Sequence, residues 1–439
     1  MLRNLIGKSL VVTLALVGVL TGEATAQQLS KFDRSRAQGM LEMIAKDVSK
    51  HYYDPKFHGV DWHARVALAK QQIDQSDSMN MALSHIAAAL DSLNDSHTFF
   101  VPPQRPFRQD YGWQTEIIGD QCYITEVEPG SDGEAKGVKP GDQVLKLNGY
   151  PPDRSNLWKM DYVYRLLRPQ PGLRFTLLNG AGQQREVDVM ASRKDLPRVR
   201  DVTGNGVWDL VREMENEEHQ RRVRWMDLGD DLMIVKFPEF LFDQSEVESL
   251  IGKARKHKAL ILDLRGNPGG AVETLRYMIG GVFDREIKIA DQAGREKSKP
   301  LVAKSMGHNS FTGKLVVLVD SKSASAAELF ARVVQLEKRG AVLGDRSSGS
   351  VMEAKQYGYQ MGEDTVIFYG ASITEFDLIM ADGKSLEHAG VTPDEVVLPS
   401  GMDLTSGRDP VLARAAATLN VKLTPEAAGK LFPYEWPKQ

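Results

Sequence analysis

The sequence predicts an α/β protein whose C-terminal half is built around a largely parallel sheet. Two apolar runs, Ala259–Leu264 and Lys314–Val319, have the length and composition of buried strands, and each precedes a polar turn and a helical stripe. Further strands are expected near Ala341–Leu343, Thr365–Tyr369 and Ile373–Leu378. Strands that alternate with helices indicate β-α-β units, in which helices cover a parallel sheet.

Residues 1–26 have the features of a secretory signal peptide. Arg3 and Lys8 precede an apolar stretch from Leu10 to Leu20, and Ala24-Thr25-Ala26 provides a cleavage site of the A-x-A type. The apolar stretch is too short for a membrane span, and no other segment is expected to cross a bilayer. We therefore expect an exported protein, located in a periplasm or outside the cell.

Composition limits the possible partners and chemistry. The 439-residue chain has a net charge of −4 and no long basic tract, so nothing indicates a nucleic-acid partner. Cys122 is the only cysteine, which excludes an intramolecular disulfide. Because Cys122 lies in an alternating apolar segment, we expect a buried strand residue rather than a nucleophile.

Changes in pattern divide the mature chain into four regions. Residues 27–107 are predicted to be helical, and residues 108–193 change to short strands and turns. Residues 194–225 are rich in charge and are interpreted as a linker or insertion without chemistry. Residues 226–439 form the α/β region.

Helical spacing and capping signals support two of these assignments. Met40, Ile44 and Val48 form an apolar stripe in the N-terminal region. In the α/β region, Ser245 and Glu248 are expected to form a capping box at the start of a helix.

Ser325 lies between the predicted strand Lys314–Val319 and the helix that follows it. A serine in the first turn of a helix faces unpaired N–H groups and the positive end of the helix dipole, which favour an alkoxide or a nearby oxyanion. The ordinary interpretation of a single serine at this place is a helix N-cap. A catalytic role therefore depends on the rest of the chain.

Several segments resemble known families. Residues 127–149 contain PGS and GVKPGDQVLKLNG, a pattern similar to that of a PDZ domain. Four segments resemble, in order, the C-terminal-processing (tail-specific) and tricorn family of serine peptidases: ALILDLRGNPGG (259–270), VLVDSKSASAAELFA (317–331), DGKSLEHAGVTPDEVV (382–397) and DPVLARAAATL (409–419). The resemblance implies a crotonase-like or ClpP-like parallel-sheet peptidase core with N-terminal helices, an inserted PDZ domain and a C-terminal helix.

The same resemblance assigns roles around Ser325. Ser325 falls on the nucleophile of the family, and the Ala326 N–H would supply one oxyanion donor. The second donor would come from the Gly-rich turn at Gly269 and Gly270, and the choice between these two glycines stays open.

The chain departs from the family members that use a lysine as general base. Ser350 stands at the position of that lysine, and Ala354 at the position of a glutamine four residues beyond. Lys355 is a reserve candidate for the base.

The tricorn-like branch instead takes its base from a histidine in the N-terminal region. His97, preceded by Ser96, matches that histidine, and Glu387 matches the glutamate of the C-terminal motif. The resemblance implies that His97 accepts the serine proton, that Ser96 orients the ring, and that Glu387 lies near the nucleophile through water.

Tyr111-Gly112-Trp113 falls where PDZ domains place the loop that binds a peptide carboxylate. The resemblance implies that a peptide with a free C-terminus would bind there as an added strand. The alternative is that this domain only spaces and orients its neighbours.

Together these assignments predict an exported serine endopeptidase that acts on proteins or peptides through an acyl-enzyme. We expect no cofactor, and no metal because neither an H-E-x-x-H motif nor a cysteine–histidine spacing occurs. The alternative is an inactive, peptidase-like protein that binds or scaffolds through its PDZ domain, as in retinoid-binding relatives of the family. The oligomeric state and the cleavage specificity stay open.

Overall fold

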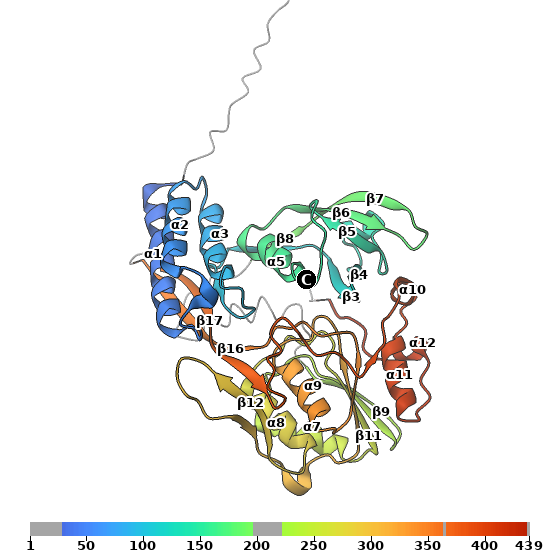
Figure 1. The fold of residues 1–439 in the computed structure, drawn as a ribbon. Coiled ribbons are helices and arrows are strands. Elements are labelled where there is room, and N and C mark those ends of the chain that lie inside the picture. The colour runs from blue at the N-terminus through green and yellow to red at the C-terminus, as the bar shows by residue number, and fades with distance from the viewer. Residues whose placement is uncertain (1–28, 196–221, 363–365, 437–439) are drawn as a thin grey trace, which may run out of the picture.

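The computed structural model describes residues 29–195, 222–362 and 366–436. Figure 1 shows three parts: N-terminal helices in blue, a small sheet domain in green, and a larger domain coloured from yellow-green to red. The expected signal peptide and most of the segment 194–225 lie outside the described residues. Within the described ranges, no helix is long and apolar enough to cross a membrane.

The larger domain contains a six-stranded sheet. Its strands are β9 (Arg224–Leu228), β10 (Leu232–Lys236), β11 (Ala259–Asp263), β14 (Lys314–Val319), β15 (Ala341–Gly344) and β18 (Glu395–Val396). The order across the sheet is β18-β15-β14-β11-β10-β9, and all neighbours run parallel except β9 and β10. The alternation of strand and helix in the sequence therefore predicted a parallel sheet correctly.

Helices cover both faces of this sheet. One face carries α7 (Gln244–Ala254), α8 (Val272–Val282) and α9 (Ala326–Leu336), whose apolar residues form one core with strand residues such as Leu260 and Val317. The other face carries α11 (Pro410–Thr418) and α12 (Pro425–Ala428), which pack against Ile234, Ile261 and Leu318. The short helix α10 (Gly401–Thr405) precedes them. The inner strands β10, β11, β14 and β15 are thus buried on both sides, which explains why these segments are continuous apolar runs in the sequence.

The start of α7 differs from the sequence-based expectation. Asp243 is the N-cap: its side chain accepts from the Glu246 N–H, and the Glu246 side chain accepts from the Asp243 N–H. The capping box predicted at Ser245 and Glu248 is therefore wrong by two residues. Aspartate caps a helix as well as serine does, and it stands earlier in the chain.

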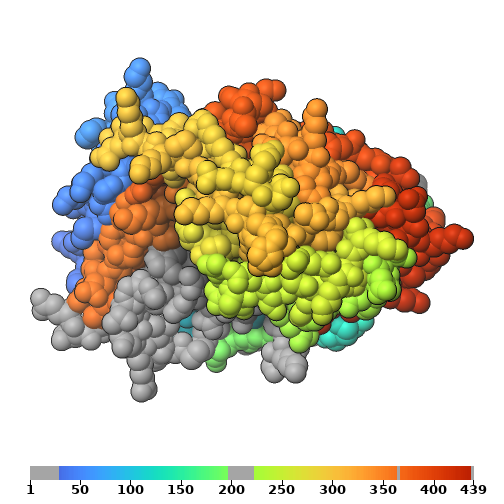
Figure 2. Space-filling model, turned by 90° about the horizontal axis from the view of Figure 1, so that it is seen from below, coloured from blue at the N-terminus to red at the C-terminus, as the bar shows by residue number. Residues whose placement is uncertain are grey.

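A second, antiparallel sheet connects the larger domain to the N-terminal helices. It has the order β1-β17-β12-β13, with β16 paired to β17, and its strands are β1 (Phe99–Val101), β12 (Ile287–Ala293), β13 (Leu301–Ala303), β16 (Met352–Met361) and β17 (Ile367–Met380). Two separate strands were expected near residues 365–378, but β17 is one strand of 14 residues. Figure 2 shows the larger domain from below, with the helical region in blue along one side.

The N-terminal helices pack on one face of β17. They are α1 (Lys31–His51), α2 (Trp62–Asp74) and α3 (Met79–Asp91). Met40, Ile44 and Val48 are buried on α1, as their spacing predicts, and share a core with Tyr369 and Ile373 of β17. This core holds the segment between α3 and β1, which contains His97, against the larger domain.

The small domain is an antiparallel sheet with short helices. The sheet has the order β3-β4-β5-β6-β7, formed by β3 (Trp113–Ile118), β4 (Gln121–Val127), β5 (Gln143–Leu147), β6 (Gly172–Leu178) and β7 (Gln184–Met190). The strands β2 (Phe107–Asp110) and β8 (Ser192–Asp195), which come before and after this sheet in the sequence, form a separate antiparallel pair. The helical elements of the small domain are α4 (Asp132–Ala135), α5 (Leu157–Asp161) and a π-helical turn (Tyr162–Leu167). Cys122 is a buried residue of β4, as predicted, and burial raises the pKa of its thiol to about 12, so it is no nucleophile at neutral pH.

Candidate active site

A cleft of about 1030 Å³ lies where the three parts of the chain meet. Its wall includes Ser325 at the start of α9, Gly270 in the turn after β11, His97 in the segment before β1, and Trp158 on α5 of the small domain. The fold therefore brings the two predicted reactive side chains, His97 and Ser325, to one cleft, although they lie far apart in the sequence.

Ser325 occupies a sharp turn between β14 and α9. Its backbone has φ 53° and ψ −119°, a region that residues other than glycine rarely adopt. The Ser325 N–H donates to the Ser350 carbonyl (2.7 Å) and to Glu328 Oε2 (3.0 Å), and these bonds hold the turn. A strained strand-to-helix turn is a recurrent way to present a nucleophilic serine.

The two glycines beside Ser325 play different structural parts. The Gly269 N–H donates to Asn267 Oδ1 at 2.8 Å, whereas the N–H groups of Gly270 and Ala326 have no partner among the described residues. Gly269 has φ +100°, and a Cβ there would lie 2.6 Å from Ser325 Cβ. Gly269 thus makes room for the serine, while Gly270 and Ala326 keep free donors that could bind an oxyanion.

Asn267, which sequence reasoning did not single out, joins the two turns that carry these groups. It is fully buried. Its side-chain Nδ2 donates to the Phe237 carbonyl (2.8 Å), and its backbone carbonyl accepts from the Ala324 N–H (2.9 Å). Because its polar atoms are bonded on both sides, Asn267 fixes the Gly-rich turn relative to the serine. An asparagine inside RGNPGG was the only signal for it in the sequence.

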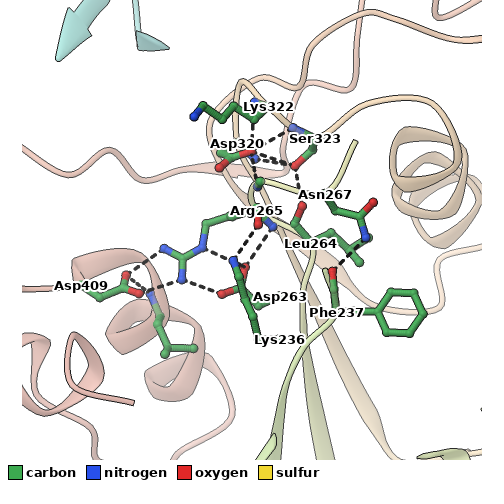
Figure 3. A network of polar contacts seen from close by, with 12 residues as sticks. Lys236, Phe237, Asp263, Leu264, Arg265, Asn267, Asp320, Lys322, Ser323 and Asp409 are labelled. Atoms are coloured by element: carbon green, nitrogen blue, oxygen red, sulfur yellow. Dashed lines mark hydrogen bonds and ion pairs between the residues drawn. The ribbon is translucent and has the colours of Figure 1, made fainter. Parts of the chain in front are cut away.

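An ion-pair network supports the turn after β11 (Figure 3). The guanidinium of Arg265 donates two hydrogen bonds to Asp263 and two to Asp409, at distances between 2.7 and 3.0 Å. Burial opposes ionisation of Asp263, but Arg265 and Lys236 outweigh it and hold the pKa of Asp263 well below its usual range. The network ties the turn after β11 to the start of α11.

Asp320 connects this turn with the loop that leads to Ser325. Asp320 Oδ1 accepts from the N–H groups of Gly266 and Ser323, each at 2.9 Å. The Ser323 hydroxyl donates to the Leu264 carbonyl at 2.8 Å, as Figure 3 shows. The loops after β11 and β14 are therefore fixed to each other before they reach the cleft.

His97 is connected to a carboxylate through Ser96. Ser96 Oγ lies 2.8 Å from His97 Nδ1 and donates to Glu387 Oε2 at 2.8 Å. Since the one hydroxyl proton of Ser96 goes to the carboxylate, Ser96 accepts the Nδ1 proton of His97. Nε2 of the neutral ring is then unprotonated and able to accept a proton.

Asp95 fixes the backbone that carries His97. Its Oδ1 accepts from the N–H groups of His97 (2.9 Å) and Thr98 (2.7 Å) and from Thr374 Oγ1 (2.8 Å) on β17. Burial lowers the pKa of His97, although Glu387 and Asp95 oppose this shift. The ring is therefore neutral at pH 7, as a base requires.

Glu387 lies behind Ser96 rather than in the cleft wall. Its Oε1 accepts from the Ser96 N–H (2.7 Å) and its Oε2 from the Val351 N–H (2.8 Å). The residues that line the cleft include His388 and Ala389, but not Glu387 itself. The structure links Glu387 to the His97 ring through Ser96, and the expected contact of Glu387 with the nucleophile through water stays a prediction.

The two positions considered for a lysine base differ in their orientation. Ser350 lines the cleft, and its backbone accepts from Ser325. Lys355 is exposed on β16, with its ammonium 5.6 Å from the centre of the Tyr357 ring. Ala354 and Gln356 line the cleft, and because neighbouring strand residues point to opposite faces, Lys355 points away from it.

Glu328, to which sequence reasoning gave no role, is fully buried behind Ser325. Its Oε1 accepts from the Ser347 hydroxyl and from the Gly349 N–H (2.7 Å). Its Oε2 accepts from the N–H groups of Ser325 and Ser350, each at 3.0 Å. One carboxylate thus joins the turn that carries Ser325 to the neighbouring loop.

Tyr111 and Trp113 lie in the core of the small domain, each 1% exposed. The Gly112 N–H between them donates to Asp110 Oδ1 at 3.2 Å. The guanidinium of Arg165 lies 5.5 Å and 5.2 Å from the centres of the Tyr111 and Trp113 rings. Arg165 also pairs with Asp161 (3.4 Å), and the binding of a peptide carboxylate at this loop stays a prediction.

Acidic, histidine and cysteine side chains do not gather in metal-binding groups of three or more within the described ranges.

Comparison with known proteins identifies a family domain in one part of the chain. Residues 231–397 match the model of Peptidase family S41. The chain carries a peptidase family S41 domain. This segment contains Ser325, Gly269, Gly270 and Glu387, whereas His97 lies before it in the chain.

Relatives of the S41 domain are proteases by name. The chain is 26% identical to the carboxy-terminal processing protease CtpA of Bacillus subtilis over 333 residues, which cover 73% of this chain and 64% of that protein. It is 22% identical to the tail-specific protease of Haemophilus influenzae over 349 residues, which cover 75% of this chain and 47% of that protein. The matches thus span about half to two thirds of these curated relatives.

Solved structures share the fold. Mature CPAF in complex with lactacystin superposes with a TM-score of 0.64 at 15% identity, covering 85% of this chain and 96% of that chain. The photosystem II D1 C-terminal processing protease gives 0.53 at 17% identity, covering 90% and 99%. The likeness therefore extends beyond the S41 domain to most of the described chain.

Proposed function

We propose that the protein is an exported serine endopeptidase that cleaves protein or peptide substrates through an acyl-enzyme at Ser325, with His97 as the base. The observation that carries this proposal is that His97, linked to Glu387 through Ser96, lines the same cleft as Ser325 and two N–H groups without a partner in the described chain. The S41 domain and its protease relatives support the reaction class. Export rests on the predicted signal peptide.

The residues suggest the following division of work. Neutral His97 takes the Ser325 hydroxyl proton at Nε2 as Oγ attacks the substrate carbonyl, and the N–H groups of Ala326 and Gly270 stabilise the oxyanion. Ser96 and Glu387 hold the ring and favour the imidazolium that forms. His97 then returns the proton to the leaving amine, and water releases the acyl group by the same steps.

The structure supports a base other than lysine. Lys355 points away from the cleft, and Ser350 occupies the position of the family lysine. The relay through Ser96 gives His97 the fixed tautomer that a base needs. We propose that this relay replaces the lysine.

A fluorophosphonate probe tests the proposed function directly. We expect a single phosphonyl adduct on the native protein, located at Ser325 by peptide mapping. A folded protein that stays unlabelled, and that hydrolyses neither casein nor peptide libraries, would overturn the proposal and favour the alternative of a binding or scaffold protein.

The two glycines beside Ser325 offer a matched pair of variants. Gly269→Ala places a methyl group 2.6 Å from Ser325 Cβ and should reduce kcat/KM about 100-fold, because a small displacement of the nucleophile has a large effect on rate. Gly266→Ala is the control: it also has a positive φ, of +73°, but its Cβ would meet nothing within 4 Å. Equal activities of the two variants in a peptide assay would contradict the assigned position of Gly269.

We also propose that the small domain is a PDZ domain that binds free C-termini of substrates. Its strand β3 lies at the edge of the five-stranded sheet, and Arg165 stands next to the predicted carboxylate loop at Tyr111-Gly112-Trp113. An added peptide strand could pair with such an edge.

Amidation of the peptide tests this role. A peptide with a free C-terminus should bind at least about tenfold more tightly than its C-terminally amidated form, because amidation removes the charge that the loop and Arg165 would stabilise. The measurement is a fluorescence anisotropy titration of the Ser325→Ala protein, which prevents cleavage. Equal affinities would leave the domain as a spacer.

A further inference from the structure

The carboxylate of Glu328 is the centre of the hydrogen bonds around the nucleophile. It receives four of them, from the Ser325 N–H, the Ser347 hydroxyl, the Gly349 N–H and the Ser350 N–H. All four donors belong to the backbone or to a neutral hydroxyl. In the described part of the chain, no charged side chain is hydrogen-bonded to Glu328.

The loop 347–351 is held between two carboxylates. Glu328 binds its first part, and Glu387 accepts from the N–H of Val351 at its end. The Ser347 hydroxyl also accepts from the Val391 N–H (2.6 Å), which extends the connection to the segment after Glu387. Glu328 therefore links the serine turn to the loop and, through it, to the glutamate that holds Ser96 and His97.

We propose that ionised Glu328 is a positioning residue that holds the Ser325 turn in its strained conformation against the loop 347–351, so that the enzyme loses activity when Glu328 is protonated. This inference rests on the proposed function. Glu328 does not line the cleft, so it is placed to act through other residues rather than on the substrate. It acts through the N–H of Ser325, the same residue whose hydroxyl reacts.

Protonation would disrupt this arrangement for a simple reason. Four donors point at the two oxygens, and an added carboxyl proton would face at least one of them. Burial raises the pKa of Glu328 to about 7, although the four hydrogen bonds oppose the shift. The ionised form therefore predominates above about pH 7, and the hold on Ser325 weakens as the pH falls through this value.

Glu328→Gln separates positioning from folding. Glutamine keeps one acceptor oxygen but turns an amide NH₂ toward two of the four donors. We expect kcat on a chromogenic peptide to fall about 10- to 100-fold with KM changed less than about threefold, because the serine is displaced while the cleft surface stays the same. The loss of activity near pH 7 should disappear, leaving only the loss caused by His97 at lower pH.

Glu337→Gln is the matched control. Glu337 follows α9 as its C-cap and pairs with Arg285 near the surface, so this variant makes the same chemical change at the other end of the same helix. It should keep the wild-type kcat and pH profile. A wild-type kcat, or an unchanged pH profile, in Glu328→Gln would overturn the inference.

Amide hydrogen exchange provides a readout that does not need activity. Peptides covering residues 323–328 and 347–351 should exchange faster in Glu328→Gln than in the wild type and in Glu337→Gln. Unchanged exchange would refute the positioning role even if the wild type proved inert. If Glu328→Gln exchanges faster than the wild type as predicted, but the wild type is not labelled by the fluorophosphonate, only the proposed function is refuted.

Discussion

Replacing Ser325 with alanine is expected to reduce peptide hydrolysis by about 10⁴-fold or more, because the variant lacks the oxygen that forms the acyl-enzyme. The measurement is the rate of release of a chromophore from a short blocked peptide, at saturating substrate. The fold should stay intact, since Ser325 donates its structural hydrogen bonds through its backbone N–H rather than its hydroxyl. Loss of a serine cap would in any case change stability by only about 1 kcal/mol.

The control for Ser325→Ala is the thermal unfolding curve together with the far-UV circular dichroism spectrum. A variant that keeps both and loses hydrolysis identifies the serine with the chemistry. Unchanged turnover in a folded Ser325→Ala protein would exclude the proposed mechanism.

Replacing His97 with alanine should have an effect of similar size, because residues that act as a unit in catalysis do not contribute additively. The Ser325→Ala/His97→Ala double variant should therefore be scarcely slower than either single variant. In the wild type, protonation of His97 should reduce kcat/KM only at a pH below the ordinary pKa of histidine, since burial lowers the pKa of the ring. The check is a pH series of kcat/KM.

Lys355→Ala is the comparison for His97→Ala. Lys355 is exposed and points away from the cleft, so its replacement should leave the rate within about twofold of the wild type. An active His97→Ala protein combined with an inactive Lys355→Ala protein would show that a lysine is the base after all.

The sequence was sufficient to predict the parallel sheet and to select Ser325, His97 and Ser96, which line one cleft, for identifiable reasons. Buried parallel strands are continuous apolar runs, and Lys314–Val319 shows this pattern clearly. Ser325, His97, Ser96 and Glu387 lie within short motifs that could be matched one residue at a time. Their spatial proximity followed from the resemblance, not from spacing, because His97 and Glu387 come from distant parts of the chain.

Details that depend on three-dimensional hydrogen bonding could not be predicted in the same way. Whether Gly269 or Gly270 keeps a free N–H depends on the side chain of Asn267, which bonds the Gly269 N–H. The role of Glu328 depends on loop 347–351 folding back over α9. From the sequence alone, Glu328 is indistinguishable from any acidic residue in the first turn of a helix.

The fold differed from expectation where tertiary pairing decided the outcome. Residues between the two expected strands near Tyr369 and Ile373 continue as one strand, because β17 pairs with β16 along nearly its whole length. The N-cap of α7 is Asp243 rather than the predicted Ser245, since both residue types can cap a helix and the backbone conformation determines which of them does.

The most direct test of the account is the intact mass of the protein during turnover. An ester or activated peptide substrate with a slowly hydrolysed acyl group is mixed with the enzyme, quenched in acid within seconds, and the protein is analysed by mass spectrometry with peptide mapping. We predict an added mass equal to the acyl group, attached to Ser325, absent from Ser325→Ala and formed much more slowly in His97→Ala. Continued hydrolysis without an adduct, or an adduct at another residue, would contradict the account.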